Sequence, residues 1–295
     1  MVRPDSRSWV IRAKDDVSFT IMKTTARRLL LMLCLVLLLN SLAIAQDNTK
    51  PFAPVSGQAG KDVVWVPTPE NTVEKMLDIA KITPQDFVMD LGSGDGRNVI
   101  GAAKRGARAL GVEFEQPMVD LSRRRAAEAG VADTANFVQG DMYEADISKA
   151  SVMLLFLLPN NMTMLLPKFL ALKPGSRIVS NTFGFGDQGW EPDQTQAVEN
   201  CQTWCTVLLW IVPADVSGSW QLPQGNLILT QKFQNVTGTL GNVAVEGKVR
   251  GDEITFTTGN ARYNGRVNAN VIEGTATTGD SSQSWHAVRA SRAPR

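Results

Sequence analysis

The chain of 295 residues contains one histidine, three cysteines and two tyrosines, and its charges nearly cancel. With 30 basic and 29 acidic side chains there is no basic excess to attract DNA or RNA, so we expect no nucleic-acid partner. A zinc site needs more histidine and cysteine ligands than the chain offers, and we expect no metal. A hydrolase with a histidine base would depend on His286 alone.

The rest of the composition is that of a globular protein, with 43% hydrophobic and 20% charged residues. A disordered chain would have fewer apolar residues, and a collagen-like chain would have far more than 24 glycines and 14 prolines. At roughly 150 residues per domain, the length predicts two domains.

Residues 22–45 have the features of a secretory signal peptide. Basic side chains (Lys23, Arg27, Arg28) precede an apolar run of eleven residues, Leu29–Leu39, and Ala43-Ile44-Ala45 offers a cleavage site. Eleven helical residues span roughly 16 Å, about half of a bilayer core, which disfavours a stable transmembrane helix. We therefore expect residues 1–45 to be an N-terminal extension and signal peptide, and the mature protein to start near Gln46 in the periplasm. Two alternatives stay open: an uncleaved segment that tethers the protein to the membrane or envelope, and an unused signal that leaves it in the cytoplasm.

Helical and strand patterns alternate through the first part of the mature chain. Helical spacing predicts helices over 70–82, 97–105, 117–129 and 162–172, and short apolar runs predict strands over 87–91, 109–114, 135–139, 152–158, 177–182 and 206–212. Residues 184–200 are rich in polar residues and are expected to form a loop. This alternation predicts an α/β domain over residues 46–213, a Rossmann-like doubly wound parallel sheet.

The pattern changes after Pro213. Residues 216–290 carry short alternating apolar runs with a glycine about every ten residues and no helical period, which predicts a small all-β meander, a barrel or a sandwich, over residues 214–295. Three similar pieces are expected to flank turns: 236–239, 263–266 and 272–275. Trp220 and Trp285 stand near the two ends of the meander, and we expect them to pair across its closing seam.

The segment with the strongest functional signal is Asp90-Leu91-Gly92-Ser93-Gly94-Asp95-Gly96-Arg97, between the first strand of the sheet and the next helix. Glycines there let the backbone turn sharply and approach a ligand at the carboxyl edge of the sheet. A dinucleotide fingerprint would place glycine where Arg97 stands. Asp90 and Asp95 would repel a pyrophosphate but suit an ammonium and a sulfonium, which favours S-adenosylmethionine. Candidate cofactor residues are therefore Asp90, Gly92, Ser93, Gly94, Asp95 and Gly96.

Two further acids follow the next strands. Glu113 lies 23 residues after Asp90, close to the spacing at which an acid meets ribose hydroxyls in this topology. Asp141, beside Met142, follows the third strand, where a carboxylate can accept a hydrogen bond from an adenine amino group. The alternative for each acid is a helix cap.

Residues from about Val66 to Thr182 resemble the class I S-adenosylmethionine-dependent methyltransferases. Within that class they are similar to small lysine methyltransferases related to the mitochondrial enzymes that modify a membrane subunit of ATP synthase. The resemblance rests on Val66-Pro67-Thr68-Pro69, the 90–97 turn, Glu113, Asp141 and Leu154–Pro159. It implies that the 90–96 turn holds the methionine portion of the cofactor, Glu113 the ribose and Asp141 the adenine, and that the methyl acceptor is a protein lysine. The chain lacks the Asp/Asn-Pro-Pro-aromatic signature of enzymes that methylate DNA or glutamine.

Thr68, Phe156 and Asn160 are the candidates to lie near the transferred methyl group, each with a structural role as the alternative. The last two cysteines, Cys201 and Cys205, are close enough for a disulfide only if the chain turns between them, and both redox states stay open. A second function also stays open: a non-catalytic envelope protein whose Rossmann-like domain binds a nucleoside-like ligand and whose β domain binds a partner.

Overall fold

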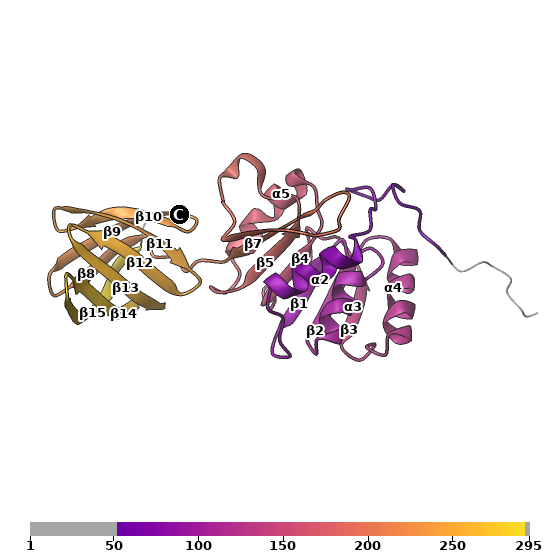
Figure 1. Ribbon diagram of the computed structural model, residues 1–295, viewed down its shortest axis with the longest axis horizontal. Helices are drawn as coiled ribbons and strands as arrows, with labels where there is room; N and C mark the ends of the chain where they lie inside the picture. Colours follow the sequence, from indigo (N-terminus) through magenta and orange to yellow (C-terminus); the bar gives the residue numbers. More distant parts are fainter. Residues whose placement is uncertain (1–51, 293–295) are drawn as a thin grey trace, which may run out of the picture. The chain divides into compact units, whose positions relative to one another are not determined.

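The computed structural model describes residues 52–292. The signal peptide predicted for residues 1–45 lies outside the described residues and stays a prediction. Residues 70–211 form an α/β fold, and residues 218–292 form a β-barrel (Figure 1). The predicted fold class is thereby confirmed, with a barrel rather than a sandwich in the second part.

A seven-stranded sheet organises the α/β part, with the strand order β3-β2-β1-β4-β5-β7-β6. Its first five strands pair in parallel. They are β1 (Phe87–Leu91), β2 (Arg108–Glu113), β3 (Ala135–Gln139), β4 (Val152–Leu155) and β5 (Arg177–Asn181). The helices between them are α2 (Glu70–Ile79), α3 (Arg97–Lys104), α4 (Gln116–Glu128) and α5 (Pro159–Leu170). Because β1 lies between β2 and β4, the strand order reverses there, which is where α/β sheets bind ligands.

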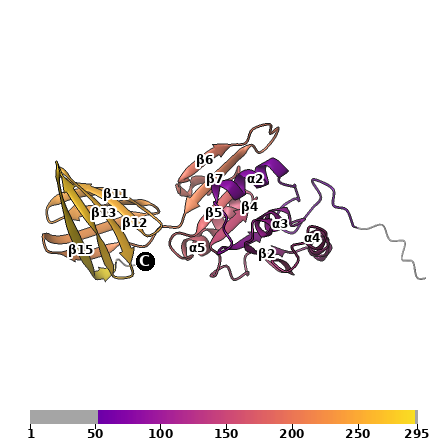
Figure 2. The same cartoon turned by 60° about the horizontal axis from the view of Figure 1, so that its bottom comes forward.

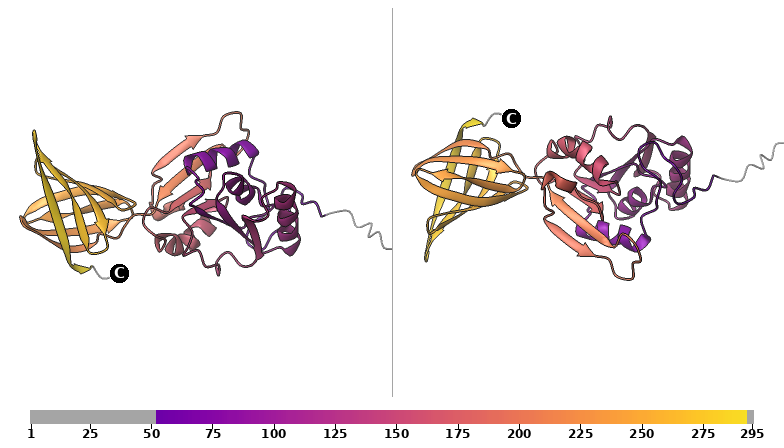
Figure 3. Two further views of the ribbon diagram at one scale, coloured as in Figure 1. Left: turned by 90° about the horizontal axis from the view of Figure 1, so that it is seen from below. Right: turned by 90° about the horizontal axis from the view of Figure 1, so that it is seen from above.

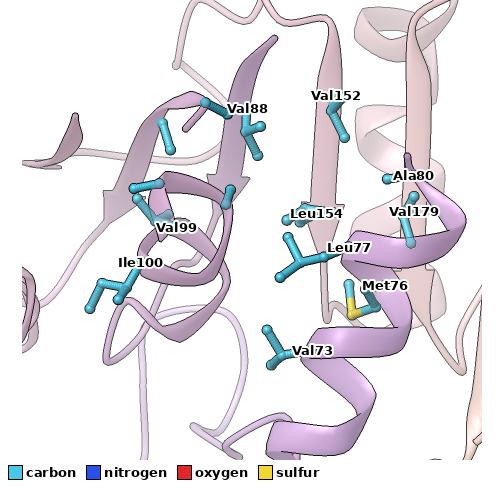
Figure 4. Close-up of a cluster of buried hydrophobic side chains, with 14 of the residues drawn as sticks. Val73, Met76, Leu77, Ala80, Val88, Val99, Ile100, Val152, Leu154 and Val179 are labelled. Carbon is cyan, nitrogen blue, oxygen red and sulfur yellow. The ribbon is translucent and has the colours of Figure 1, made fainter. Parts of the chain in front are cut away.

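The parallel strands are buried on both faces because helices cover each side. Alternate residues of one strand contribute to different cores: Val88 faces the core under α2, α3 and α4, whereas Met89 faces the core under α5. In Figure 4 the α2 side chain Leu77 points toward Leu154 of β4, with Met76 on the next part of the helix, and all three are completely buried. Truncating such a leucine to alanine costs about 2–5 kcal/mol, so these contacts fix the helices over the sheet.

At the edge of the sheet the structure differs from the prediction of a loop over residues 184–200. Residues 184–200 contain a 3₁₀ turn, η1 (Gly186–Gln188), and a strand, β6 (Gln194–Ala197). β6 pairs antiparallel with β7 (Thr206–Ile211), which itself runs antiparallel to β5, so the sheet is mixed rather than all parallel. The loop prediction was wrong because Gln194-Thr-Gln-Ala has no apolar alternation, and its strand conformation comes from pairing with β7.

The eight strands of the barrel follow one another in the chain, and the last, β15, closes onto the first, β8 (Figures 2 and 3). Side chains fill its interior, as expected for a barrel of this strand number. Trp220, Phe256 and Trp285 are among the buried residues. The strands are β8 (Gly218–Leu222), β9 (Gly225–Lys232), β10 (Asn235–Leu240), β11 (Val243–Arg250), β12 (Glu253–Thr258), β13 (Ala261–Asn268), β14 (Val271–Thr278) and β15 (Ser281–Arg292).

Two expectations about the barrel need correction. The repeated glycines do not flank turns: Gly265 and Gly274 pair with each other inside β13 and β14, and a Cβ on Gly265 would lie 2.7 Å from the Trp285 ring. Gly265 therefore makes room for that tryptophan, and Gly274 makes room for the backbone of Asn264 on the neighbouring strand. Strands β8 and β15 do close the barrel, but the Arg289 guanidinium covers the Trp220 ring at 4.1 Å, and Trp285 packs edge-on against Phe256 instead.

None of the helices between residues 52 and 292 is both long enough and apolar enough to cross a membrane. The domain boundary at residues 213/214 stays a prediction.

Candidate functional site

The turn after β1 is shaped by three glycines with positive φ, Gly92, Gly94 and Gly96 (+73°, +55° and +83°). The backbone N–H groups of Gly92 and Ser93 donate to the Val112 carbonyl of β2 at 2.8 and 3.1 Å, which fixes the turn at the edge of the sheet. A Cβ on Gly96 would lie 2.7 Å from the Phe137 ring, so the turn packs tightly against β3. Larger residues cannot adopt this path without strain.

Asp90 is the penultimate residue of β1 and is 3% exposed. Its carboxylate accepts one side-chain hydrogen bond, from Asn98 Nδ2 at 3.1 Å. Burial raises the pKa of Asp90 well above its usual range, and the nearby charges of Glu113 and Asp95 raise it further. Such a carboxylate favours a cationic ligand group, which would restore the lost solvation of its charge.

The second acid of the turn, Asp95, has a different environment. Burial alone would raise its pKa, but the hydrogen bonds and charges of Arg97 and Arg125 lower it. Arg97 donates to both Asp95 oxygens, at 2.9 and 2.5 Å, and also to the Thr68 carbonyl. The Asp95 side chain is 2% exposed and lines neither cavity described below. Its carboxylate thus holds the turn against the arginines, and its predicted contact with the cofactor stays a prediction.

Glu113 and Asp141 both line the larger of two adjoining open cavities, whose empty space together with its mouth is about 690 Å³. Glu113 accepts hydrogen bonds from Gly94 N at 2.8 Å and from Glu115 N at 3.0 Å, so it joins the turn to the end of β2. Asp141 accepts from Tyr143 N at 2.8 Å and from Lys61 Nζ at 2.5 Å. The Lys61 hydrogen bond is the largest cause that lowers the pKa of Asp141. Met142 also lines this cavity.

A smaller cavity of about 320 Å³ is lined by Asp90, Ser93 and Asn98. The two cavities share four lining residues: Trp65, Val66, Gly92 and Phe156. Residues 58–66 line the larger cavity, and their contribution was missed from the sequence. Within this segment only Val66 belonged to a recognisable motif. Lys61 donates a hydrogen bond to Asp141, which is 80 residues away in the sequence.

The structure brings together two of the three residues predicted near the methyl group. Phe156 lines both cavities, and Thr68 is buried and lines the smaller one. Asn160 is exposed in the first turn of α5 and lines neither cavity. Its neighbour Asn161 turns inward and donates to the Tyr143 hydroxyl at 2.7 Å.

A family model described as the ANTKMT methyltransferase domain matches residues 90–194. A protein-lysine N-methyltransferase of Saccharolobus islandicus is 42% identical over 153 residues, which are 51% of this chain and 94% of that protein. The chain belongs to the protein-lysine N-methyltransferase family. It is an S-adenosylmethionine-dependent methyltransferase, and the resemblance inferred from the 90–97 turn and the strand-end acids is confirmed.

Other relatives match a similar share of the chain. A lysine N-methyltransferase of Mus musculus, named for its action on ATP synthase, is 36% identical over 132 residues. These residues are 44% of this chain, and the chain spans about half of that enzyme's length (52%). The solved structure of an RNA methyltransferase from Salinibacter ruber in complex with S-adenosyl-L-homocysteine is 44% identical. It covers 51% of this chain and 96% of its own, with a TM-score of 0.48.

The residues of the methyltransferase fit S-adenosylmethionine. Ser93 Oγ and Asn98 Oδ1 are buried beside Asp90 without hydrogen-bond partners, so polar atoms are free where the amino-acid portion of the cofactor would bind. Buried polar atoms of this kind normally have partners. Within residues 52–292 no three histidine, cysteine, aspartate or glutamate side chains are grouped to hold a metal ion.

Proposed function

We propose that the methyltransferase transfers methyl groups to the side-chain amine of lysine in a protein. The observation that carries this proposal is the 42% identity across nearly the whole of an enzyme named for that reaction. Charge supports it: without residues 1–45 the chain loses seven basic and three acidic side chains, which leaves a net charge of −3. An RNA substrate would favour the opposite sign.

Each portion of the cofactor has a partner in the two cavities. S-adenosylmethionine supplies an electrophilic methyl group on a sulfonium. Asp90 would hold its ammonium, Glu113 its ribose hydroxyls and Asp141 its adenine amino group. Glu113 also holds the turn through Gly94 N, so ribose binding and the conformation of the turn depend on one carboxylate.

We place Phe156 and Thr68, which both line the smaller cavity, beside the lysine amine that accepts the methyl group. A lysine amine attacks only when neutral, and an apolar surrounding lowers the pKa of an amine because it disfavours the charged form. The lysine therefore enters as an ammonium, gives its proton to solvent, and attacks as a neutral amine where the Phe156 ring excludes water. Positioning and exclusion of water then supply the rate enhancement, so the reaction needs no dedicated base.

Methyl-group labelling tests this function directly. Protein starting at Gln46 is incubated with methyl-labelled S-adenosylmethionine and a membrane extract that contains both protein and RNA. We expect protease-sensitive label, recovered as methyl-lysine after hydrolysis, and much less label with Asp90→Ala. Label that RNase removes would overturn lysine as the acceptor. Binding of S-adenosylhomocysteine without any transfer would favour the non-catalytic alternative.

We also propose that the enzyme acts outside the cytoplasm. Two features support this: the signal-peptide pattern of residues 22–45, and the disulfide between Cys201 and Cys205, a bond that persists in oxidising compartments. A phosphatase reporter that is active only outside the cytoplasm, fused after about residue 60, should be active. An inactive fusion would show that the enzyme is not exported and acts in the cytosol.

A further inference from the structure

Three aromatic side chains from separate segments meet beside the cofactor cavities. Phe156 follows β4, Phe183 follows β5, and Trp204 lies in the loop between β6 and β7. The Phe156 and Phe183 rings are nearly parallel, with centroids 6.1 Å apart. Trp204 meets Phe156 edge-on at 5.6 Å. We call these three residues the aromatic cluster.

The aromatic cluster joins the cavities to the surface. Phe156 lines both cavities, where the two portions of the cofactor would meet. Trp204, at the other end of the cluster, is 36% exposed. Packing in a hydrophobic core therefore does not explain why a tryptophan stands at position 204.

The backbone around Trp204 is held in an unusual conformation. Trp204 has a φ of +55°, in the left-handed region that side chains other than glycine seldom adopt. The Cys201–Cys205 disulfide closes the loop around it. Asn71 of α2 donates to the Glu199 carbonyl at 3.0 Å, which attaches the same loop to the α/β fold. Non-glycine residues kept in this region are concentrated at ligand sites, because the surrounding structure must offset the strain.

The chemistry of the aromatic cluster suits an ammonium with an aliphatic stem. The faces of aromatic rings attract cations, tryptophan most strongly, and a lysine stem packs against ring surfaces. The polar groups next to Phe183 are uncharged: Ser180 Oγ and Asn181 Nδ2 are buried at the end of β5 without hydrogen-bond partners. A cationic acceptor would therefore meet ring faces, with no charged side chain contributed by the end of β5.

We propose that Phe156, Phe183 and Trp204 bind the lysine side chain of the methyl acceptor, and that the Cys201–Cys205 disulfide keeps Trp204 in place for this. The inference rests on the proposed function, since it assigns the acceptor site of the same reaction. Trp204 is a specificity residue that selects a cationic side chain, while Phe156 directs the amine toward the cavities.

A product analogue tests the proposal without knowledge of the natural acceptor. Protein saturated with S-adenosylhomocysteine is titrated with Nα-acetyl-trimethyllysine amide and with the uncharged analogue in which carbon replaces the quaternary nitrogen. We expect the charged probe to bind at least tenfold more tightly. Trp204→Ala should abolish this preference, and Trp204→Phe should keep most of it. Phe52→Ala, whose side chain is similarly exposed (38%) and lines neither cavity, should change nothing.

The affinity for S-adenosylhomocysteine separates this idea from a general loss of structure. It should be unchanged in Trp204→Ala and in the paired variant Cys201→Ser, Cys205→Ser, and the paired variant should also lose the preference for the charged probe. Equal binding of the two probes to the unmodified protein would overturn the proposal, as would an unaltered preference in Trp204→Ala. Methyl-lysine formed with an unchanged KM for the acceptor in Trp204→Ala would refute the acceptor site but leave lysine methylation standing. RNase-sensitive label together with a retained, Trp204-dependent preference would refute lysine methylation but support the cation site.

Discussion

The α/β fold and the barrel place their irregular features differently. In the barrel, positive φ values such as those of Gly241, Gly251 and Gly279 occur in two-residue turns between strands, and the interior is packed with apolar and aromatic side chains. In the α/β fold three of them, Gly92, Gly94 and Gly96, fall within five residues of one turn after β1, beside a buried acid with one side-chain hydrogen bond. The barrel follows local rules along its length, whereas the α/β fold departs from them where the cofactor would bind. Such departures are expected at functional sites.

The largest effect is expected from a glycine inside the barrel. A Cβ on Gly238 of β10 would overlap the Ile228 carbonyl oxygen of the neighbouring strand, so Gly238→Ala must push two paired strands apart. We expect a loss of about 4 kcal/mol or more, the range of severe core defects. Thermal unfolding followed by circular dichroism measures it.

Gly241→Ala is the matched control for this prediction. Gly241 lies three residues further on, in a turn with a φ of +58°, and its Cβ would meet nothing within 4 Å. Only the left-handed conformation is then penalised, by about 1–2 kcal/mol. If the two regions are separate domains, Gly238→Ala should still bind S-adenosylhomocysteine. Loss of that binding along with the barrel would show that the barrel and the α/β fold unfold as one unit.

The next largest loss of stability is expected at Asp86, a buried acid of the α/β fold whose carboxylate is hydrogen-bonded and ion-paired. Asp86, just before β1, accepts hydrogen bonds from Ser151 Oγ and Thr83 N, both at 2.8 Å, and pairs with Arg177. Burial alone would raise its pKa, but these hydrogen bonds and the arginine charge lower it. Asp86→Asn should therefore cost about 2–3 kcal/mol of unfolding free energy at pH 7.

The lowered pKa of Asp86 also predicts how its contribution to stability changes with pH. A lowered pKa means that the folded protein holds the proton more weakly than the unfolded chain, so the contribution of Asp86 is present above the ordinary aspartate pKa and is lost as the pH falls below it. Urea unfolding at several pH values should show the parent protein and Asp86→Asn converging in acid. Asp78→Asn, which removes one partner of an exposed ion pair with Arg105, should cost less than about 1 kcal/mol at any pH. Parallel curves for the parent and Asp86→Asn would refute the assignment.

Local pattern predicted much of the architecture. The bounds of β1 and β3 follow from short apolar runs, and the 90–97 turn follows from glycines and acids next to each other in the chain. The acids Glu113 and Asp141 were found because parallel strands end at one edge of a sheet, so spacing along the chain translates into a shared cavity.

Contacts between distant segments could not be predicted in this way. Lys61 reaches Asp141 from a segment without periodicity, and Arg125 reaches Asp95 because α4 and the turn are neighbours only in the folded chain. That Asn160 faces solvent while Asn161 is buried has a local cause. A shift of one residue in a helix rotates a side chain by about 100°, and sequence alone places helix starts less accurately than that.

The smallest effect sharpens the comparison most, because it predicts opposite changes in stability and in binding. Burial raises the pKa of Asp90, so the folded protein binds this proton more tightly than the unfolded chain does. Stability then falls as the pH rises from the ordinary aspartate pKa toward the raised one.

Asp90→Asn removes the negative charge and keeps the shape of the side chain. At pH 7 it should raise the unfolding free energy without ligand by about 1–2 kcal/mol. It should also weaken S-adenosylhomocysteine about tenfold, because the ligand ammonium loses its carboxylate. Thermal unfolding and calorimetric titration measure the two changes, and a variant that is less stable and binds equally well would make Asp90 a structural residue. The barrel offers a control in Thr258→Val, which removes a buried hydroxyl without a partner and should stabilise the fold without changing cofactor affinity. A gain in stability from both variants, with a loss of binding only from Asp90→Asn, would show that the cost of a buried, incompletely solvated polar group serves the cofactor in the α/β fold alone.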